Sequence, residues 1–210
     1  MRHLQRREFL FHSRSRFTSL FVVRSGSLKL TALTREGREQ IVAFLLPGDI
    51  AGLDSMGIAT HLTTAVALEE SSVIEVPVEE ARQLCVTTGR VRDGLLDSLG
   101  VQIRRKQSTL VLLGSQSADE RLARFLLDLW QRLAPPGTGN ATVLVPMTRQ
   151  EMGSYLGLKL ETVSRTLSRL CRYGAIERVP RGLRLCNVDR LQEIADCETR
   201  PAKSKTSPAG

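Results

Sequence analysis

The sequence is poor in aromatic residues and has no long apolar run. Aromatic residues make up 4% of the chain and hydrophobic residues 41%, so any core must be mainly aliphatic. No segment approaches the ~20 apolar residues that a membrane-spanning helix needs. The basic N-terminus also lacks the apolar segment of a signal peptide. We therefore expect a cytoplasmic protein with no membrane partner.

Closely spaced metal ligands are absent as well. The four cysteines are Cys85, Cys171, Cys186 and Cys197. They form no CxxC pair and no Cys/His cluster with zinc spacing, so we interpret them as small apolar fillers. The three histidines, His3, His12 and His61, are scattered, and we expect them at the surface. Because no nucleophile–base pair or phosphate loop occurs either, the sequence does not predict an enzyme.

Positive charge is concentrated near the C-terminus. Residues 1–90 hold 11 basic and 10 acidic side chains, whereas residues 148–184 hold eight basic and three acidic ones, a local net charge of +5. Such an excess attracts a polyanion, and nucleic acid is the usual one. A solvated surface could carry the same charge, so the charge alone does not identify a nucleic-acid-binding protein.

The first part of the chain predicts short strands and turns. Alternating or β-branched segments are bounded by Gly, Pro and Asp, which is typical of a small antiparallel barrel or roll. The expected strands are 19–23, 27–33, 40–46, 62–68 and 72–76.

A long helix is predicted over residues 91–115, after a short one at 77–85. Its seam has heptad spacing and consists of Leu96, Leu99, Ile103, Lys106, Leu110 and Leu113. Heptad spacing indicates a coiled-coil partner helix, and a helix packed on its own domain is the alternative. The length and the charges around the seam favour a dimer, which Lys106 would weaken.

Two capping boxes mark helices in the last part of the chain. Ser117 with Glu120 begins a helix that we expect to run to residue 134, and Thr148 with Glu151 begins another that Gly157 ends. A further helix is expected from Lys159 or Leu160 to residue 173, with Gly174 after it. Two helices joined by a tight glycine turn form a helix-turn-helix.

The outer flank of that last helix is polar. We expect Leu160, Val163, Leu167 and Leu170 to face inward, and Glu161, Arg165, Ser168 and Arg172 to face outward with Ser164 at the margin. Such a flank suits base edges in a major groove. Strands at 175–179 and 183–186 around a Pro/Gly turn would form a basic wing. A helical protein-interaction domain is the alternative.

Residues 148–165, TRQEMGSYLGLKLETVSR, resemble the helix-turn-helix of the CRP/FNR regulators, in particular the FNR branch. Segments 17–26, 36–41, 46–49 and 118–123 also match, so the resemblance covers nearly the whole chain. It implies an α+β fold with an N-terminal antiparallel β-roll (a cupin-like double-stranded β-helix), a long dimerisation helix and a C-terminal winged helix-turn-helix. The implied domains are 1–90, 91–116 and 117–196, with a disordered tail at 197–210. The implied function is DNA-binding transcription regulation by a homodimer.

The resemblance also implies which residues meet DNA. Glu161, Ser164 and Arg165 form the E-x-x-S-R reading pattern of the FNR branch, so we expect an inverted TTGAT-like half-site. Arg165 can pair with a guanine, and Glu161 can accept from a cytosine or adenine amine. Further expected DNA contacts are Thr148, Arg149, Lys159, Ser168, Arg169, Arg172 and Arg181.

A hairpin at residues 34–40 resembles the loop by which FNR-type activators touch RNA polymerase. Its acidic candidates are Glu36 and Glu39. A plain solvated turn is the alternative for this segment.

The signal that such a regulator would sense is not specified by the sequence. Ile74 stands where the FNR branch has a cysteine ligand, so we expect no iron–sulfur cluster. No arginine occurs between Arg38 and Arg82, so a cyclic nucleotide phosphate would be buried without a partner, and we do not expect that ligand. A regulator with heme or a cyclic nucleotide in the β-roll stays the alternative, and the cofactor is left unknown.

Overall fold

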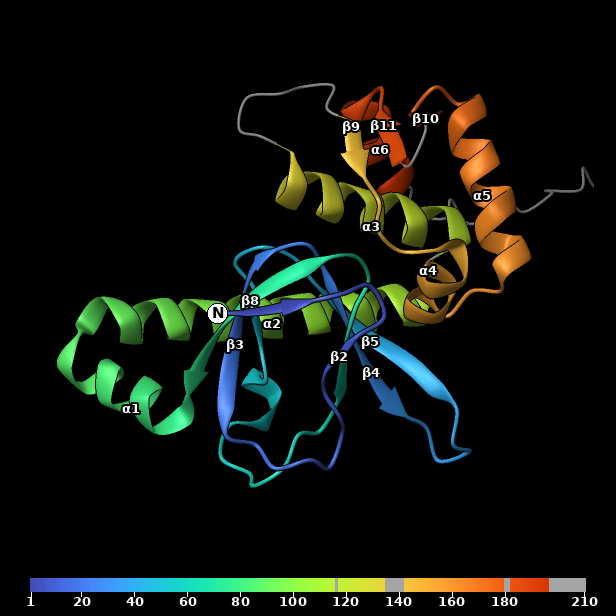
Figure 1. Ribbon diagram of the computed structural model, residues 1–210. Coiled ribbons are helices and arrows are strands. Elements are labelled where there is room, and N and C mark those ends of the chain that lie inside the picture. The colour runs from blue at the N-terminus through green and yellow to red at the C-terminus, as the bar shows by residue number, and fades with distance from the viewer. Residues whose placement is uncertain (116, 135–141, 180–181, 197–210) are drawn as a thin grey trace, which may run out of the picture.

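The computed structural model shows an α+β protein in which a β-roll and a winged helix are joined by a long helix (Figure 1). It describes residues 1–115, 117–134, 142–179 and 182–196. The predicted tail at 197–210 and the predicted DNA contact Arg181 lie outside these ranges.

The N-terminal part forms the antiparallel roll that the sequence predicts, and it consists of two four-stranded sheets. Their strand orders are β1-β8-β3-β6 and β2-β7-β4-β5. The strands are β1 Arg2–Leu4, β2 Phe9–Phe11, β3 Ser19–Ser25, β4 Leu28–Leu33, β5 Glu39–Leu45, β6 Ile50–Ala51, β7 Thr64–Ala67 and β8 Ser71–Pro77, with a short 3-10 helix at Leu53–Ser55. Alternate apolar side chains fill the space between the sheets, and Leu4, Leu28 and Val73 are fully buried there.

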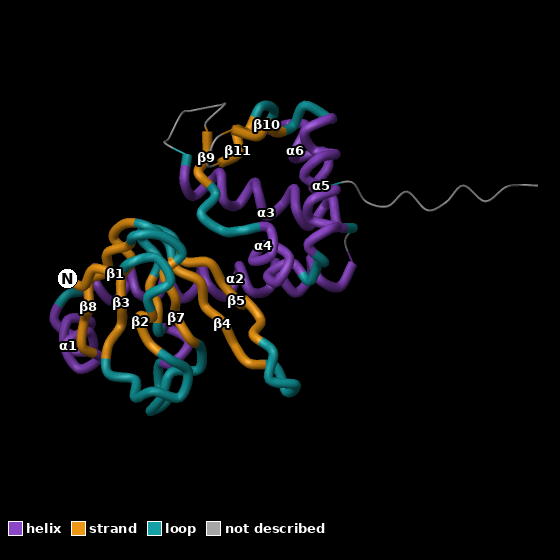
Figure 2. The backbone as a smooth tube through the Cα atoms, turned by 45° about the vertical axis from the view of Figure 1, so that its right-hand side comes forward, coloured by secondary structure: helices purple, strands orange, loops and turns teal. Residues whose placement is uncertain are grey.

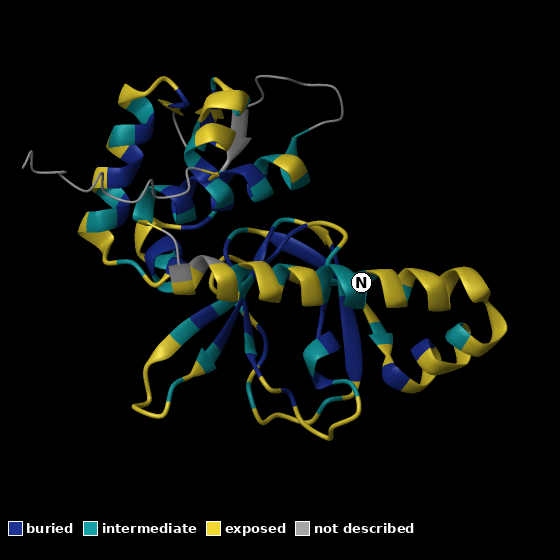
Figure 3. Ribbon diagram, turned by 180° about the vertical axis from the view of Figure 1, so that it is seen from behind, coloured by how far each residue is buried: buried dark blue, intermediate teal, exposed yellow. Residues whose placement is uncertain are grey.

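Two helices follow the roll. Helix α1 spans Val78–Thr87 and α2 spans Gly89–Ser115. Leu95 and Leu99 of α2 pack against a small cluster of roll residues, while the outer face of the helix is largely exposed (Figure 3). Leu99 of the predicted seam therefore lies against its own domain.

The winged helix has an aliphatic core under a three-stranded sheet with the order β10-β11-β9. Its elements are α3 Ala118–Leu133, β9 Thr142–Leu144, α4 Arg149–Leu156, α5 Leu160–Arg172, β10 Ile176–Val179, β11 Gly182–Leu185 and α6 Val188–Ala195. Both predicted capping boxes are formed, at Ser117 and at Thr148. The predicted helices and the basic hairpin are confirmed.

The β-roll and the winged helix share one hydrophobic core. Ile41, Phe44 and Leu46 of the roll belong to the same buried cluster as Phe125 of α3 and Met152 of α4. Helix α4 lies beside strand β5, with α3 above the roll (Figure 2). The orientation of the winged helix is therefore fixed by packing against the roll.

Five of the described elements were not predicted from the sequence: β1, β2, β6, the 3-10 helix at Leu53–Ser55 and α6. Within the described ranges, every helix is too short or too polar to cross a membrane.

Candidate nucleic-acid interface

The helix-turn-helix is held by tight backbone contacts. Helix α4 begins at Thr148, whose hydroxyl accepts from the Glu151 N–H (3.2 Å), while the Glu151 carboxylate accepts from the Thr148 N–H (2.8 Å). It ends at Gly157, which has a left-handed φ of 65°. A Cβ at Gly153 would lie 2.6 Å from the carbonyl oxygen of Leu158, so only glycine allows the turn to pass this closely.

The inner face of α5 differs from the prediction at one residue. Val163, Leu167 and Leu170 are buried as expected, but Leu160 is 45% exposed. Leu160 is the first residue of the helix, and the partly buried Leu158 of the preceding turn packs against the core beside it. The prediction that Leu160 faces inward was therefore wrong.

The outer face of α5 presents the predicted polar side chains. Glu161, Arg165, Ser168 and Arg172 are exposed and Ser164 is half-buried. Among the described residues, neither Glu161 nor Arg165 has a hydrogen bond or ion pair, so both side chains can meet a ligand. The helix lies at the outer edge of the winged helix, away from the roll (Figure 1).

The wing lies beside this face. The Arg178 guanidinium donates to the Ser168 hydroxyl (2.9 Å), and Arg184 pairs with Glu177 (3.1 Å). Between α5 and the wing lies an open groove of about 500 Å³. Its lining residues are Ser168, Cys171, Gly174, Ile176, Glu177, Arg178 and Cys186.

The other predicted DNA contacts do not all share the outer surface. Thr148, Arg149 and Lys159 are exposed where α4 and α5 begin. Arg169, in contrast, turns toward α3 and pairs with Asp119. The hydrogen bond that Arg169 donates to the Asp119 carboxylate raises the pKa of this guanidinium above its ordinary value.

Helix α4 is tied to the roll by an ion pair. The Lys29 ammonium of β4 lies 2.8 Å from a Glu151 carboxylate oxygen, and both side chains are mostly buried. Burial raises the pKa of Glu151, but the hydrogen bonds from Lys29 and Thr148 outweigh it, so the pKa lies below its usual value. The capping residue of α4 therefore also fixes this helix to the roll.

Strand β5 is an edge strand whose free side is covered by α4. The Ile41 N–H donates to the Ser154 hydroxyl (3.1 Å), and the Gln40 side chain donates to the Ser154 carbonyl. The first of these contacts satisfies a backbone N–H that the edge strand would otherwise leave open.

Tyr155 connects four elements. Its ring contacts Phe44 of β5 and Phe125 of α3, with centroids 5.2 and 5.6 Å away, and its hydroxyl shares a 3.0 Å hydrogen bond with Thr109 of α2. Burial raises the pKa of this phenol. Tyr155 thus joins the helix-turn-helix to the roll and to the long helix at once.

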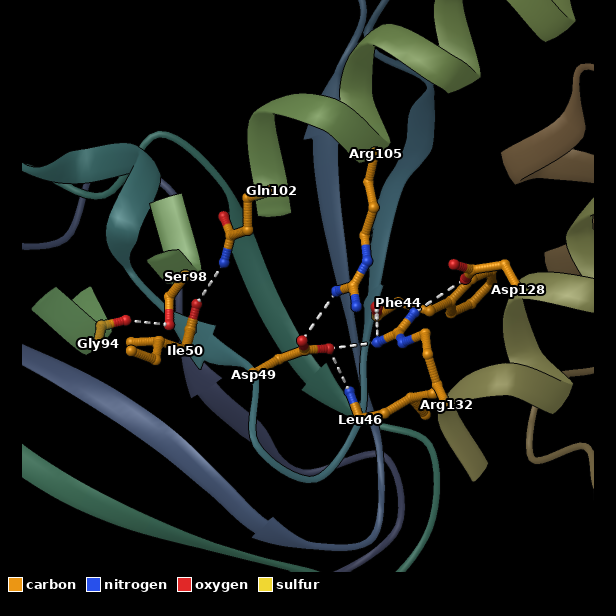
Figure 4. A network of polar contacts seen from close by, with 10 residues as sticks. All are labelled: Phe44, Leu46, Asp49, Ile50, Gly94, Ser98, Gln102, Arg105, Asp128 and Arg132. Carbon is orange, nitrogen blue, oxygen red and sulfur yellow. Dashed lines mark hydrogen bonds and ion pairs between the residues drawn. The ribbon is translucent and has the colours of Figure 1, made fainter. Parts of the chain in front are cut away.

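Asp49 accepts contacts from two arginines on different helices (Figure 4). One carboxylate oxygen accepts from Arg105 of α2 (2.8 Å), and the other accepts from Arg132 of α3 and from the Leu46 N–H (2.9 Å). Arg132 also pairs with Asp128 (3.2 Å). The turn before β6 is therefore the point where roll, long helix and winged helix meet.

The predicted seam of α2 forms an exposed apolar face. Ile103 is 54% and Leu110 is 70% exposed, and Leu96, Lys106 and Leu113 are exposed as well. Leu113 also lies near the turn after α4, because a Cβ added to Gly157 would be 3.1 Å from the Cδ2 atom of Leu113.

The predicted polymerase contacts lie on the hairpin between β4 and β5. Glu36 and Glu39 are exposed, and Gly37 at its tip has a φ of 75°. Arg38 approaches Glu36 at 3.9 Å, with both side chains largely in solvent.

His61 was predicted at the surface, but it is only 3% exposed. Its ring stacks on Phe11 at 3.7 Å and meets the edge of Phe17. Burial lowers the pKa of His61, and the nearby Asp54 carboxylate offsets part of this effect. The aromatic stack explains the error, because Phe11 is distant in the sequence.

The residues at the loops of the roll do not fit a cyclic nucleotide. The Asp54 carboxylate accepts from the Thr63 hydroxyl (3.0 Å) beside the buried residues Leu53 and Ser55. A phosphate there would meet this negative charge, and the chain has no arginine between Arg38 and Arg82 to offset it.

The described cysteines do not fit an iron–sulfur ligand set. Cys85 lies on α1 and Cys171 and Cys186 lie in the winged helix, while Ile74 is exposed on β8. In the part of the chain that the structure describes, no three His, Cys, Asp or Glu residues gather as metal ligands.

Comparisons with known proteins match both parts of the chain. Residues 1–88 match the family model of the cyclic nucleotide-binding domain, and residues 120–194 match the Crp-like helix-turn-helix domain. The transcriptional activator protein FnrA of Stutzerimonas stutzeri is 39% identical over 194 residues, covering 92% of this chain and 80% of that protein. The transcriptional activator protein anr of Pseudomonas aeruginosa is 40% identical over 175 residues, covering 83% of this chain and 72% of that protein.

A solved structure has the same fold. The structure of FixK2 from Bradyrhizobium japonicum aligns with a TM-score of 0.82 and 32% identity, covering 92% of this chain and 95% of that chain.

Proposed function

The chain belongs to the CRP/FNR family of DNA-binding transcription regulators, and we propose that it binds a palindromic FNR-like site as a homodimer that contacts RNA polymerase. Its relatives are transcription regulators and not enzymes. We further propose that it works in the cytoplasm, where DNA and polymerase are present. Neither an iron–sulfur cluster nor a cyclic nucleotide is part of this proposal.

The outer face of α5 carries the proposal. Glu161 and Arg165 project from it without partners among the described residues, while the opposite face is anchored in the core. Side chains that are exposed on a fixed helix can enter a major groove and pair with base edges. The exposed Thr148, Arg149 and Lys159 would then meet phosphates, which set the register without carrying sequence information.

A binding measurement tests this function. Fluorescence anisotropy with a labelled TTGAT…ATCAA duplex should give an affinity at least about 10-fold higher than with a duplex whose half-sites are scrambled. Equal affinity for the two duplexes would contradict the proposal that the protein recognises this DNA sequence.

We propose that the exposed face of α2 pairs with the same face of a second copy. Large apolar side chains at heptad spacing in water are the usual signature of a helix dimer. Lys106 would lie near the dimer axis, where two ammonium groups repel and lose hydration.

Lys106→Leu should therefore tighten the dimer, lowering its dissociation constant about fivefold or more. Analytical ultracentrifugation over a concentration series measures this constant. Arg104→Leu is the matched control, because it makes a similar change on the flank of the same helix. If the Lys106 variant and the unmodified chain dissociate alike, Lys106 lies outside the dimer contact.

Charge reversal at Glu36 and Glu39 tests the polymerase contact. Both side chains are exposed at the far end of the β4–β5 hairpin, so their replacement by lysine should leave DNA affinity unchanged and reduce activated transcription in vitro about 10-fold. Reversal of Glu79 and Glu80, exposed on α1, is the control. If DNA affinity falls together with transcription, the hairpin has a structural role instead.

A further inference from the structure

Arg169 belongs to α5 but does not point where its neighbours point. Its Nε donates to an Asp119 carboxylate oxygen (3.1 Å), and its Nη2 contacts the same oxygen and donates to the Thr166 hydroxyl (3.1 Å). Thr166 is fully buried under the helix. The guanidinium is thus held on the side of α5 that faces α3.

Asp119 lies at the N-terminal end of α3, where the backbone is held by a cap. It lies in the first turn, directly after the Ser117 capping box, in which the Glu120 carboxylate accepts from the Ser117 N–H (2.9 Å). Glu120 itself is buried. A cap of this kind fixes the backbone of the first turn, so Asp119 is held in place at the start of α3.

The Asp119 carboxylate also offsets the charge of Arg169. A guanidinium that is paired with a carboxylate at hydrogen-bond distance attracts a phosphate much less than a free one. Arg165 and Arg172 are exposed on the same helix and have no ion pair among the described residues, so within α5 these two arginines attract DNA most strongly.

We propose that Arg169 is a positioning residue that fixes the reading helix α5 to the N-terminal end of α3 through Asp119, and that it does not contact DNA. The inference rests on the proposed function, since it takes α5 to be the helix that reads DNA. The pair thereby fixes Glu161 and Arg165, which lie one to two turns earlier on α5, relative to the first turn of α3.

A charge-swap experiment tests the pair. The variants are Arg169→Gln, Asp119→Asn and the double variant Asp119→Arg with Arg169→Asp. Affinity for the TTGAT…ATCAA duplex and for a scrambled duplex is measured by anisotropy between about 50 and 200 mM salt. Arg82→Gln, which breaks an exposed ion pair with Glu79 on α1, is the control.

Each single change should weaken binding to the palindromic duplex about fivefold and leave binding to the scrambled duplex unchanged, because loosened reading side chains lose base contacts but not phosphates. The slope of log affinity against log salt should stay the same. The swap should restore affinity to within about twofold, and the control should change neither duplex.

Three outcomes would overturn the inference. A phosphate contact by Arg169 would lower the salt slope by about 1 in Arg169→Gln, leave Asp119→Asn unimpaired, and make the swap the weakest binder. A merely structural role would lower affinity for both duplexes in proportion to the unfolded fraction, which circular dichroism records. Unchanged affinity in both single variants would show that the Asp119–Arg169 pair has no role in DNA binding.

If the protein does not recognise the palindromic duplex at all, the experiment gives a result that differs from these three outcomes. The unmodified chain would then show no preference between the duplexes, whereas thermal unfolding of the single and swapped variants would still report whether Asp119 and Arg169 interact.

Discussion

Asp49→Asn should destabilise the protein by about 2 kcal/mol, because the mostly buried Arg132 guanidinium loses one of its two carboxylate partners and keeps only the more exposed Asp128. The Asp49 side chain is 13% exposed and that of Arg132 is 14% exposed, so solvent screens the pair weakly. Arg105 loses its partner in the same variant. The change keeps the shape of the side chain, so the lost charge is the main cause of the effect.

Urea unfolding followed by fluorescence measures this effect. Trp130 is the only tryptophan, and it packs from α3 against the core that the roll and the winged helix share. Glu193→Gln is the matched control, because the Arg190–Glu193 pair is exposed and such pairs contribute at most about 1 kcal/mol. Equal losses in the two variants would show that the junction at Asp49 does not hold the winged helix on the roll.

Apart from α6, the α-helices in the described part of this protein were predictable from local signals. Ser117 and Thr148 are each followed by a glutamate three residues later, and both boxes form because the two side chains satisfy free backbone groups of the same turn. Gly157 ends α4 for an equally local reason, since its left-handed φ suits a residue without Cβ. Such signals need no knowledge of the rest of the fold.

The short strands were not predictable in this way. β1 and β6 have three and two residues, and each exists because it pairs with β8 or β3, strands distant in the sequence. Too few residues alternate in such a segment to show a period. Burial of His61 has the same origin, because its aromatic partner Phe11 comes from another strand.

The candidate site shows the limit of helical periodicity. Periodicity correctly placed Glu161, Arg165 and Ser168 on the outer face of α5. It could not show that Leu160 lies beyond the packed core, or that Asp119 of another helix draws Arg169 away from that face. The contacts between the roll and the winged helix were also missed, since Asp49 and Arg132 carry no local signal of their pairing.

Arg165→Ala should weaken binding to the palindromic duplex by about 1–3 kcal/mol, which is roughly 5- to 150-fold. Arg165 is exposed on the outer face of α5 and has no partner among the described residues, so its guanidinium is available for a guanine edge. A bidentate contact to the two acceptors of guanine is lost completely on truncation to alanine. Discrimination at the guanine of TTGAT should relax, because no other side chain then reads this base.

Duplexes with each of the four bases at that position separate base reading from charge. The control is Arg178→Ala, because this arginine lies on the wing beside Ser168 and would meet phosphates. The control should weaken all four duplexes about equally and lower the salt slope by about 1, since phosphate contacts release counterions whatever the sequence. Arg165→Ala should instead bring the four affinities closer together by lowering that of the guanine duplex most. If Arg165→Ala weakens all four alike, Arg165 contacts the backbone, and the reading of this base must come from another residue of α5.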